Sequence, residues 1–433
     1  MSCRKFLAAL VVIVSIANPA PAQPKAKPDQ KPYAVIECGG SGVKFICLNA
    51  ALKNGKVEYE IVATGDLQAS GGLLNKDGKL VSGLTKDGAE AVARMYHAEL
   101  VKKHGIDPNR IVIFASSAFD ALEADQQALL RHEIWSALGR GGAAGWELKL
   151  AGIKKTVKAD KPGAWDSILS DAIPIPILTP HLEQKYTIFG LQRFDPNSGL
   201  YSCADIGSGT LKAGCLYPGG DSALPQFRCL RDVVPGTKAL PKLLADGWTA
   251  PNRIVGDLNG VTKKQLEPLG AYALGASGLN GRKINYLLGG AAWGLLLVCK
   301  AEQSLSKGDE LEIMPVEVTA ADVKKFFEIM TTTRNAEGRL VYPPRPAVRG
   351  LTREQLKRQE DEYQRLQGVF NPEQLACGAS LLKQTVAMLN YSDADKKLYV
   401  IKNGQFTLAL GYAENLAQGE LGGVQAERIK LPK

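Results

Sequence analysis

The stretch Glu37-Cys38-Gly39-Gly40-Ser41-Gly42 joins two β-rich runs, and Asp205-Ile206-Gly207-Ser208-Gly209-Thr210 joins two more further along the chain. The flanking runs cover residues 33–36 and 43–48 in the first case, and 201–204 and 211–217 in the second. Both segments follow one order: a strand, a carboxylate, one further residue, a glycine-rich turn and a second strand. The two predicted hairpins are therefore an internal repeat.

Each glycine-rich turn offers clustered backbone amide groups with few side chains, which phosphoryl oxygens need for close approach. Each segment also begins with an acid, Glu37 or Asp205. Two acids that converge across a cleft can hold a hydrated divalent cation that bridges phosphate oxygens. The alternative is a pair of ordinary glycine turns with capping acids. A third glycine pair, Gly289-Gly290, follows a strand-like run and begins a helical one.

The rest of the chain alternates strand-like and helical patterns. It has 433 residues, 45% hydrophobic and 22% charged, which is enough for two packed lobes. Helices are expected at residues 87–104, 119–137, 293–303, 320–333, 352–367 and 372–389. Further strands are expected at residues 57–64, 110–115, 173–178, 284–288, 398–401 and 406–410. The highly charged helix at 352–367 is predicted to lie on the surface, with its side chains in solvent.

The N-terminal residues have the pattern of a signal peptide. Arg4 and Lys5 precede an apolar run, and the small-x-small sequence Ala20-Pro21-Ala22 follows it. The alternative is an uncleaved membrane anchor, but the run is about a dozen residues and a spanning helix needs roughly 20. The sequence therefore predicts a signal peptide at 1–23, a proline-rich linker at 24–32 and an exported protein, periplasmic or secreted, with no membrane attachment after cleavage.

Charge and cysteine content indicate which ligands, disulfides and metal sites the protein can have. Lys plus Arg (53) exceed Asp plus Glu (44), and the net charge of +9 suits phosphorylated polyanions as well as ordinary solubility. No nucleic-acid-binding motif is found, so a nucleic-acid partner is not expected. In an oxidising compartment, Cys38 with Cys47 and Cys203 with Cys215 flank the hairpins at spacings that allow two local disulfides. No His or Cys spacing fits a zinc site.

Five segments, taken in order, resemble the exopolyphosphatase and guanosine pentaphosphate phosphohydrolase (Ppx/GppA) family. They are IECGGSGVKFI, IVIFASSAFDALEADQQALL, ILTPHLEQKYTIFGL, SCADIGSGTLKAGCL and NYLLGGAAWGL. The resemblance covers residues 33–412 and implies an actin-like (ribonuclease H-like), duplicated, two-lobed α/β fold with a central cleft. Lobe I is expected at 33–180, lobe II at 181–415 and a C-terminal tail at 416–433.

The resemblance also implies roles for single residues. Glu183 lies seven residues before Gly190, as the family's catalytic glutamate precedes its motif glycine, and is expected to orient or deprotonate the attacking water. Mg²⁺ or another divalent cation is expected near Glu37 and Asp205. Gly289 and Gly290 are expected to form a third loop or a nucleotide contact. The expected phosphate-binding residues are Gly39, Gly40, Ser41, Gly42, Lys44, Gly207, Ser208, Gly209, Thr210 and Lys212.

Several positions depart from the family pattern. The first-loop aspartate is Glu37 here, Gly40 and Gly42 partly replace the loop hydroxyls, and the glutamate expected seven residues after Asp205 is Lys212. An ammonium group at that position weakens metal binding or contacts phosphate directly. Residues 115–122 resemble a family segment that usually contains an arginine, and this arginine is also missing here.

The sequence thus predicts an exported, metal-dependent hydrolase of phosphoanhydride bonds, acting on polyphosphate or on guanosine pentaphosphate and other nucleoside polyphosphates. Secreted apyrases, which hydrolyse nucleoside tri- and diphosphates, share the two loops and the intervening glutamate and are the second candidate. If the ligand is a nucleotide, Trp293 would stack on its base; the alternative is a core tryptophan. A protein that binds a phosphate ligand without turnover is the third candidate, because of Lys212.

Overall fold

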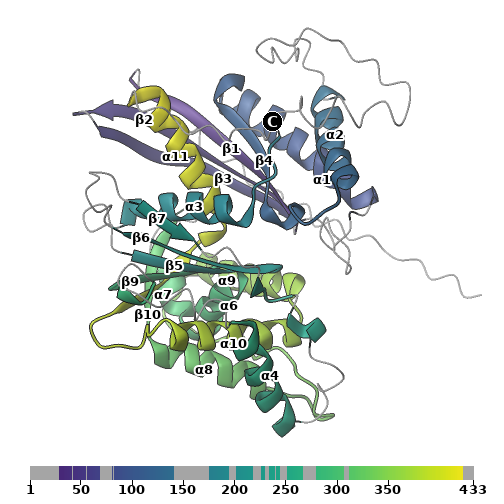
Figure 1. Cartoon of the computed structure of the whole chain (residues 1–433), viewed down its shortest axis with the longest axis vertical. Coiled ribbons are helices and arrows are strands. Elements are labelled where there is room, and N and C mark those ends of the chain that lie inside the picture. Colours follow the sequence, from purple (N-terminus) through teal and green to yellow (C-terminus); the bar gives the residue numbers. More distant parts are fainter. Residues whose placement is uncertain are drawn as a thin grey trace, which may run out of the picture.

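The computed structural model describes thirteen segments of the chain. They are residues 29–40, 42–54, 56–68, 80, 82–140, 175–194, 201–217, 226–229, 234–238, 240–243, 251–266, 279–306 and 312–422. In Figure 1 they form two parts, one coloured purple to blue and the other mostly teal to green. The predicted signal peptide and Ser41 lie outside the described residues.

The first sheet has the strand order β3-β2-β1-β4. Its strands are β1 (Lys31–Gly39), β2 (Gly42–Lys53), β3 (Lys56–Gln68) and β4 (Ile111–Ala115). β1 and β2 form the first predicted hairpin, and β4 runs parallel to β1. Because successive side chains of a strand point to opposite faces, Ala34 and Ile36 enter one core, whereas Tyr33 and Val35 enter another.

The second sheet repeats this plan. Its described strands have the order β10-β11-β9-β5-β6-β7, and β8 also pairs with β6. Their bounds are β5 (Tyr201–Ile206), β6 (Thr210–Tyr217), β7 (Gln226–Cys229), β8 (Val234–Pro235), β9 (Ile284–Leu288), β10 (Met314–Val318) and β11 (Lys397–Lys402). β5 and β6 form the second hairpin, and β9 runs parallel to β5 as β4 does to β1. The protein therefore has the predicted mixed α/β fold built on two sheets.

Helices cover the outer faces of both sheets (Figure 1). α1 (Ser82–Arg94), extended by a π-helical segment (Met95–Lys103), and α2 (Ala124–Arg140) pack on the first sheet. The helices of the second part are α4 (Pro251–Gln265), α6 (Gly290–Cys299), α7 (Ala301–Ser306), α8 (Ala320–Thr332), α9 (Arg353–Val369) and α10 (Pro372–Met388). None of the described helices is both long enough and apolar enough to cross a bilayer.

Two further helices, α3 (Pro180–Leu191) and α11 (Thr407–Leu421), contribute to a core shared by both sheets. Tyr33 of the first sheet and Tyr201 of the second belong to this core, together with Tyr186 of α3 and Tyr412 of α11. The rings of Tyr186 and Tyr412 lie 4.7 Å apart between centroids. The shared core joins the two parts of the chain.

The two helices of this core cross at a pair of glycines, Gly190 and Gly411. A Cβ atom added to Gly411 would overlap the carbonyl oxygen of Tyr186 and lie 2.6 Å from the backbone nitrogen of Gly190. A Cβ atom on Gly190 would in turn overlap the carbonyl oxygen of Thr407. The backbones of α3 and α11 therefore touch directly, which explains why glycine occupies position 190.

The predicted strand at residues 406–410 is wrong. Phe406 ends a short 3₁₀ turn, and α11 begins at Thr407 and runs through Leu421. A short apolar run does not distinguish a buried strand from a buried helix by periodicity alone. α11 packs on β1 and β2, so residues that the sequence assigns to lobe II cover the first sheet, and the predicted tail 416–433 begins inside this helix.

The two suggested disulfides do not form: Cys38, Cys47, Cys203 and Cys215 all carry thiols, as do Cys299 and Cys377. Cys203 pairs with Gly214 across the strands and Cys215 with Ser202, so the two cysteines face opposite sides of the sheet. Cys38 pairs with Val43 and Cys47 with Ala34, which separates these cysteines by four residues along the ladder, roughly 13 Å. Strand register therefore excludes both bridges.

Glu414 of α11 is buried beside Tyr59 of β3 and Arg193. Burial raises the pKa of Glu414 from 4.5 to about 8, although Tyr59 and Arg193 act in the opposite direction. Because the folded-state pKa is the higher one, the stabilising contribution of protonated Glu414 is complete below pH 4.5 and is lost as the pH rises toward 8.

Relative to a Glu414→Gln variant, wild type is expected to lose about 3 kcal/mol of unfolding free energy between about pH 4.5 and pH 7. Glutamine keeps the size of the side chain and does not ionise. Urea unfolding of both proteins across this pH range measures the difference. A difference that does not vary with pH would contradict the buried, neutral state of Glu414.

Candidate active site

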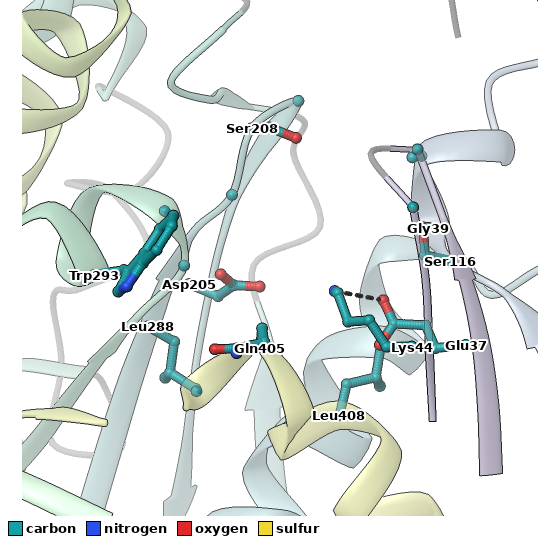
Figure 2. A pocket seen from close by; sticks show the side chains of 18 of the residues that line it. Glu37, Gly39, Lys44, Ser116, Asp205, Ser208, Leu288, Trp293, Gln405 and Leu408 are labelled. Atoms are coloured by element: carbon teal, nitrogen blue, oxygen red, sulfur yellow. Dashed lines mark hydrogen bonds and ion pairs between the residues drawn. The ribbon is translucent and has the colours of Figure 1, made fainter. Parts of the chain in front are cut away.

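The two hairpins face each other across one cleft, with a cavity volume of about 220 Å³. In Figure 2, Glu37, Gly39 and Lys44 lie on one wall, and Asp205 and Ser208 lie on the other. The cleft lining includes all the described residues that the sequence proposes for the site: Glu37, Gly39, Gly40, Gly42, Lys44, Glu183, Asp205, Gly207, Ser208, Gly209, Thr210, Lys212, Gly289 and Gly290. The structure thus brings them together, while their roles remain predictions.

Both hairpins place an acid directly opposite a lysine on the neighbouring strand. Glu37 of β1 pairs with Lys44 of β2, and Asp205 of β5 pairs with Lys212 of β6. The Lys44 ammonium lies 3.3 Å from Glu37 Oε1, and the Lys212 ammonium lies 3.5 Å from Asp205 Oδ2. The internal repeat therefore extends from the turns to the charged side chains beneath them.

Glu183 lies in the first turn of α3. Thr179 caps this helix, because its hydroxyl oxygen accepts a hydrogen bond from the backbone N–H of Leu182 at 3.3 Å, and Pro180 occupies the first helical position. Proline there loses no helical hydrogen bond and already has a helical φ. The sequence Thr179-Pro180 thus fixes where α3 begins and directs Glu183 into the cleft.

The Glu183 carboxylate has a partner on each side of the cleft. Oε2 accepts a hydrogen bond from the backbone N–H of Ser117 at 2.7 Å, and the Lys212 ammonium donates to Oε1 at 2.5 Å. Only 9% of the Glu183 side chain is exposed. The Thr187 hydroxyl donates to the Glu183 carbonyl one turn later. Glu183 is therefore held in one position.

These contacts set the charges of the site. Burial opposes ionisation of Glu183, but the charge and hydrogen bond of Lys212 and the bond from Ser117 outweigh it and lower its pKa. Burial also disfavours the charged form of Lys212, yet Glu183 and Asp205 raise its pKa. Burial raises the pKa of Glu37 and Asp205, with Lys44 and Lys212 respectively acting against it. At neutral pH, Glu183 is a carboxylate and Lys212 an ammonium.

The second glycine-rich turn is fixed from behind by residues 236–238. The carbonyls of Gly207, Ser208 and Gly209 accept hydrogen bonds from the backbone N–H groups of Thr237, Lys238 and Gly236, respectively, at 2.7 to 2.9 Å. In a trans peptide the carbonyl and the following N–H point in opposite directions. The N–H groups of Ser208, Gly209 and Thr210 therefore point away from residues 236–238. These three residues line the cleft, so the turn presents donors for an anion.

Gly289 brings a third segment against the second hairpin. Its φ of +87° is in the region that favours glycine, and an added Cβ atom would overlap the carbonyl oxygen of Ile206 and lie 2.6 Å from Asp205 Oδ1. Gly289 precedes the first residue of α6, whose N-terminus therefore opens at the cleft next to Asp205. Helix N-termini stabilise anions; the third loop or nucleotide contact expected of Gly289 and Gly290 stays a prediction.

An ion pair that joins the two walls of the cleft could not be seen in the sequence patterns. Arg365 of α9 forms an ion pair with Asp66 of β3, and its guanidinium lies 5.4 Å from the ring centroid of Trp293. The Trp293 indole donates to Glu362 at 3.0 Å. Helix α9 was predicted to be a solvated face, but it places Arg365 in the cleft. The helix has a buried face, formed in part by Tyr363 and Leu366 three residues apart, but its highly charged composition made it look fully exposed.

Ser117 is a second residue that sequence patterns missed. It follows β4 within the segment that lacks the family's arginine, and it acts through its backbone N–H, which donates to Glu183. A backbone contact of this kind requires no particular side chain. The signal available in the sequence was the position of Ser116-Ser117 at the end of a buried strand, where site residues gather in α/β folds.

The donor set does not form a metal centre held by the protein alone. Within the described segments, no group of three or more His, Cys, Asp or Glu residues is placed to hold a metal ion. Glu37 and Asp205, the predicted Mg²⁺ ligands, are each paired with a lysine. Glu37 Oε2 is buried without a hydrogen-bond partner, which leaves one acceptor that a ligand or water can use. Metal binding by Glu37 and Asp205 stays a prediction.

Two solved structures have the same architecture. The Ppx/GppA family member from Aquifex aeolicus matches with a TM-score of 0.53 and 13% identity, over 87% of this chain and 97% of that chain. An exopolyphosphatase from Cytophaga hutchinsonii matches with a TM-score of 0.55 and 12% identity, over 90% of this chain and 98% of that chain. This chain has the Ppx/GppA fold.

The predicted actin-like, two-lobed fold is thereby confirmed. No family model matches the sequence, and no curated protein matches it either. At 12 to 13% identity the structural likeness extends to the fold alone.

Proposed function

We propose that this protein hydrolyses the terminal phosphoanhydride bond of polyphosphate or of a nucleoside polyphosphate. The observation that carries the proposal is the position of Glu183. It is a buried carboxylate that receives one hydrogen bond from Ser117 and one from Lys212, in a cleft walled by two glycine-rich turns. A carboxylate placed between two phosphate-binding loops is suited to positioning water against a bound phosphorus atom.

In the proposed complex the terminal phosphate lies between the two turns. The N–H groups of Ser208, Gly209 and Thr210 donate to its oxygens from one wall, and Lys44 approaches it from the other. The N-terminus of α6 adds partial positive charge near Asp205. Donors that are already fixed in place stabilise the charge of the transition state without reorganisation.

Glu183 positions the attacking water in line with the bond that breaks. The water oxygen bonds to phosphorus, the bridging P–O bond breaks, and its electron pair stays with the departing phosphate chain. The proton of the water leaves through Glu183 or solvent, and the products are inorganic phosphate and a chain shortened by one unit. The lowered pKa of Glu183 makes it a weak base, which suits a role in orienting water, because phosphoryl transfer passes through a loose transition state.

The solved neighbours named as exopolyphosphatases make polyphosphate the first substrate to test. We expect phosphate release from at least one of polyphosphate, guanosine pentaphosphate, ATP and ADP. Preference for polyphosphate or guanosine pentaphosphate supports the main proposal, and preference for ATP and ADP supports the apyrase alternative. Measurable binding with no turnover of any of the four overturns the hydrolase proposal in favour of a binding protein.

Export is part of the proposal and is supported by the N-terminal sequence. Arg4, Lys5, the apolar run at 6–17 and Ala20-Pro21-Ala22 have the order of a signal peptide. An exported protein is expected to lose about 23 residues, so that mass spectrometry of the purified native protein detects a chain beginning near Pro24. Recovery of the intact N-terminus from the cytoplasm would count against export.

A further inference from the structure

The cleft contains a cation of its own, the ammonium group of Lys212. It lies 2.5 Å from Glu183 Oε1 and 3.5 Å from Asp205 Oδ2, and 11% of the side chain is exposed. Lys212 extends from β6 directly opposite Asp205, so strand register fixes its position. The ammonium thus joins the proposed catalytic carboxylate to the acid of the second hairpin.

A divalent cation held by Asp205 beside Glu183 would compete with this ammonium. Mg²⁺ needs oxygen ligands at about 2.0–2.1 Å in octahedral geometry, yet the Lys212 ammonium already lies 2.5 Å from Glu183 Oε1 and 3.5 Å from Asp205 Oδ2. Two cations so close together in a buried cleft repel each other strongly. The residues around Asp205 therefore fit an ammonium better than a metal ion.

The first hairpin holds a second ammonium in the equivalent place. Lys44 lies opposite Glu37 as Lys212 lies opposite Asp205, and both lysines line the cleft. Each ammonium has three N–H donors. Lys212 donates one of them to Glu183 and forms an ion pair with Asp205 at 3.5 Å, which leaves a donor for a phosphate oxygen. The two ammonium groups together carry two positive charges, the same formal charge as one divalent cation.

We propose that Lys212 replaces the divalent cation of this site, so that the protein binds and hydrolyses its substrate without metal. The inference rests on the proposed hydrolase function. Lys212 neutralises the phosphate that is attacked and holds Glu183 in place, and Lys44 neutralises it from the opposite wall. No oxidant, reductant or further co-reactant is required, because the reaction consumes only water and the phosphoanhydride.

The test compares phosphate release in excess EDTA and in Mg²⁺, using whichever of polyphosphate, guanosine pentaphosphate, ATP or ADP wild type hydrolyses. Wild type is expected to work equally fast, within about twofold, in both conditions. Lys212→Gln is expected to lose about 100-fold in both, as when a fixed transition-state donor is removed. Lys212→Glu is expected to be equally slow in EDTA and to recover in Mg²⁺, because a third carboxylate beside Asp205 and Glu183 completes a cation site.

A second measurement does not depend on turnover. The thermal unfolding midpoint of wild type is expected to stay constant on titration with MgCl₂, whereas that of Lys212→Glu rises and saturates, since a ligand that binds only the folded state stabilises it. Lys103→Gln is the control, because it breaks an exposed lysine–glutamate ion pair, with Glu99, away from the cleft.

The possible failures are distinguishable. Wild-type turnover that EDTA abolishes overturns the role of Lys212 and leaves the hydrolase proposal standing. No turnover in either condition overturns the hydrolase proposal, and the MgCl₂ titrations then decide the inference about Lys212. In them, a saturable rise of the wild-type midpoint contradicts an ammonium in place of the metal.

Discussion

A Glu183→Gln variant is expected to release phosphate about 100 to 10,000 times more slowly than wild type, with little change in substrate affinity. Glutamine has nearly the same shape and its carbonyl oxygen can still accept the hydrogen bond from Ser117. It lacks the negative charge that orients water, and its amide group cannot accept from Lys212. The loss should therefore appear in kcat and hardly in KM.

Glu354→Gln is the matched control. Glu354 also lies in the first turn of a helix, α9, but its side chain is exposed and away from the cleft. Initial rates of phosphate release and binding of the same substrate, measured for wild type and both variants, separate catalysis from affinity. If Glu183→Gln and Glu354→Gln retain equal activity, Glu183 does not position the water.

Gly411→Ala is expected to prevent folding, or to reduce the free energy of unfolding by more than about 3 kcal/mol. That value is the upper end of the usual cost of inserting extra methylene groups into a packed core. The new methyl group would overlap the Tyr186 carbonyl oxygen at the crossing of α3 and α11. The overlapping atoms are backbone atoms inside helices, so no side-chain rotation can relieve the overlap. The crossing would have to open, and with it the core that both sheets share.

Gly260→Ala provides the comparison for this second prediction. Gly260 lies inside α4, and an added Cβ atom meets nothing within 4 Å. Alanine there should stabilise the protein by up to about 1 kcal/mol, because it favours the helix more than glycine does. Urea unfolding measures both variants. If Gly411→Ala is as stable as wild type, the helices do not touch as described.

The hairpins and the residues beneath them could be predicted from the sequence because their signals are local. A strand, an acid, a glycine-rich turn and a second strand occupy one short segment, and turn chemistry determines the geometry. Glu183 could be placed only by resemblance, through its spacing to Gly190. The crossing of α3 and α11 now gives the glycine at position 190 a physical reason, since it lets the two helix backbones meet.

The parts that could not be predicted depend on contacts between distant segments. The composition of α9 is typical of a solvated helix, and nothing near Arg365 in the sequence points to Asp66, which comes from a strand 299 residues away. The cysteines lie close in sequence, but strand register, which spacing does not reveal, separates them. The departure at Lys212 was visible in the sequence, whereas its contact with Glu183 required the fold.

The position of Glu183 between the two walls of the cleft links its hydrogen bonds to any opening of the cleft. Its carboxylate is bonded to the segment after β4 through Ser117 and to β6 through Lys212, while Asp66 and Arg365 join β3 to α9. A rotation that opened the cleft for substrate entry would stretch these bonds together. Opening would then release the carboxylate from its amide or from its counter-ion, and closure would restore both. Under the proposed function, Glu183 would then be held ready to orient water only when the cleft is closed.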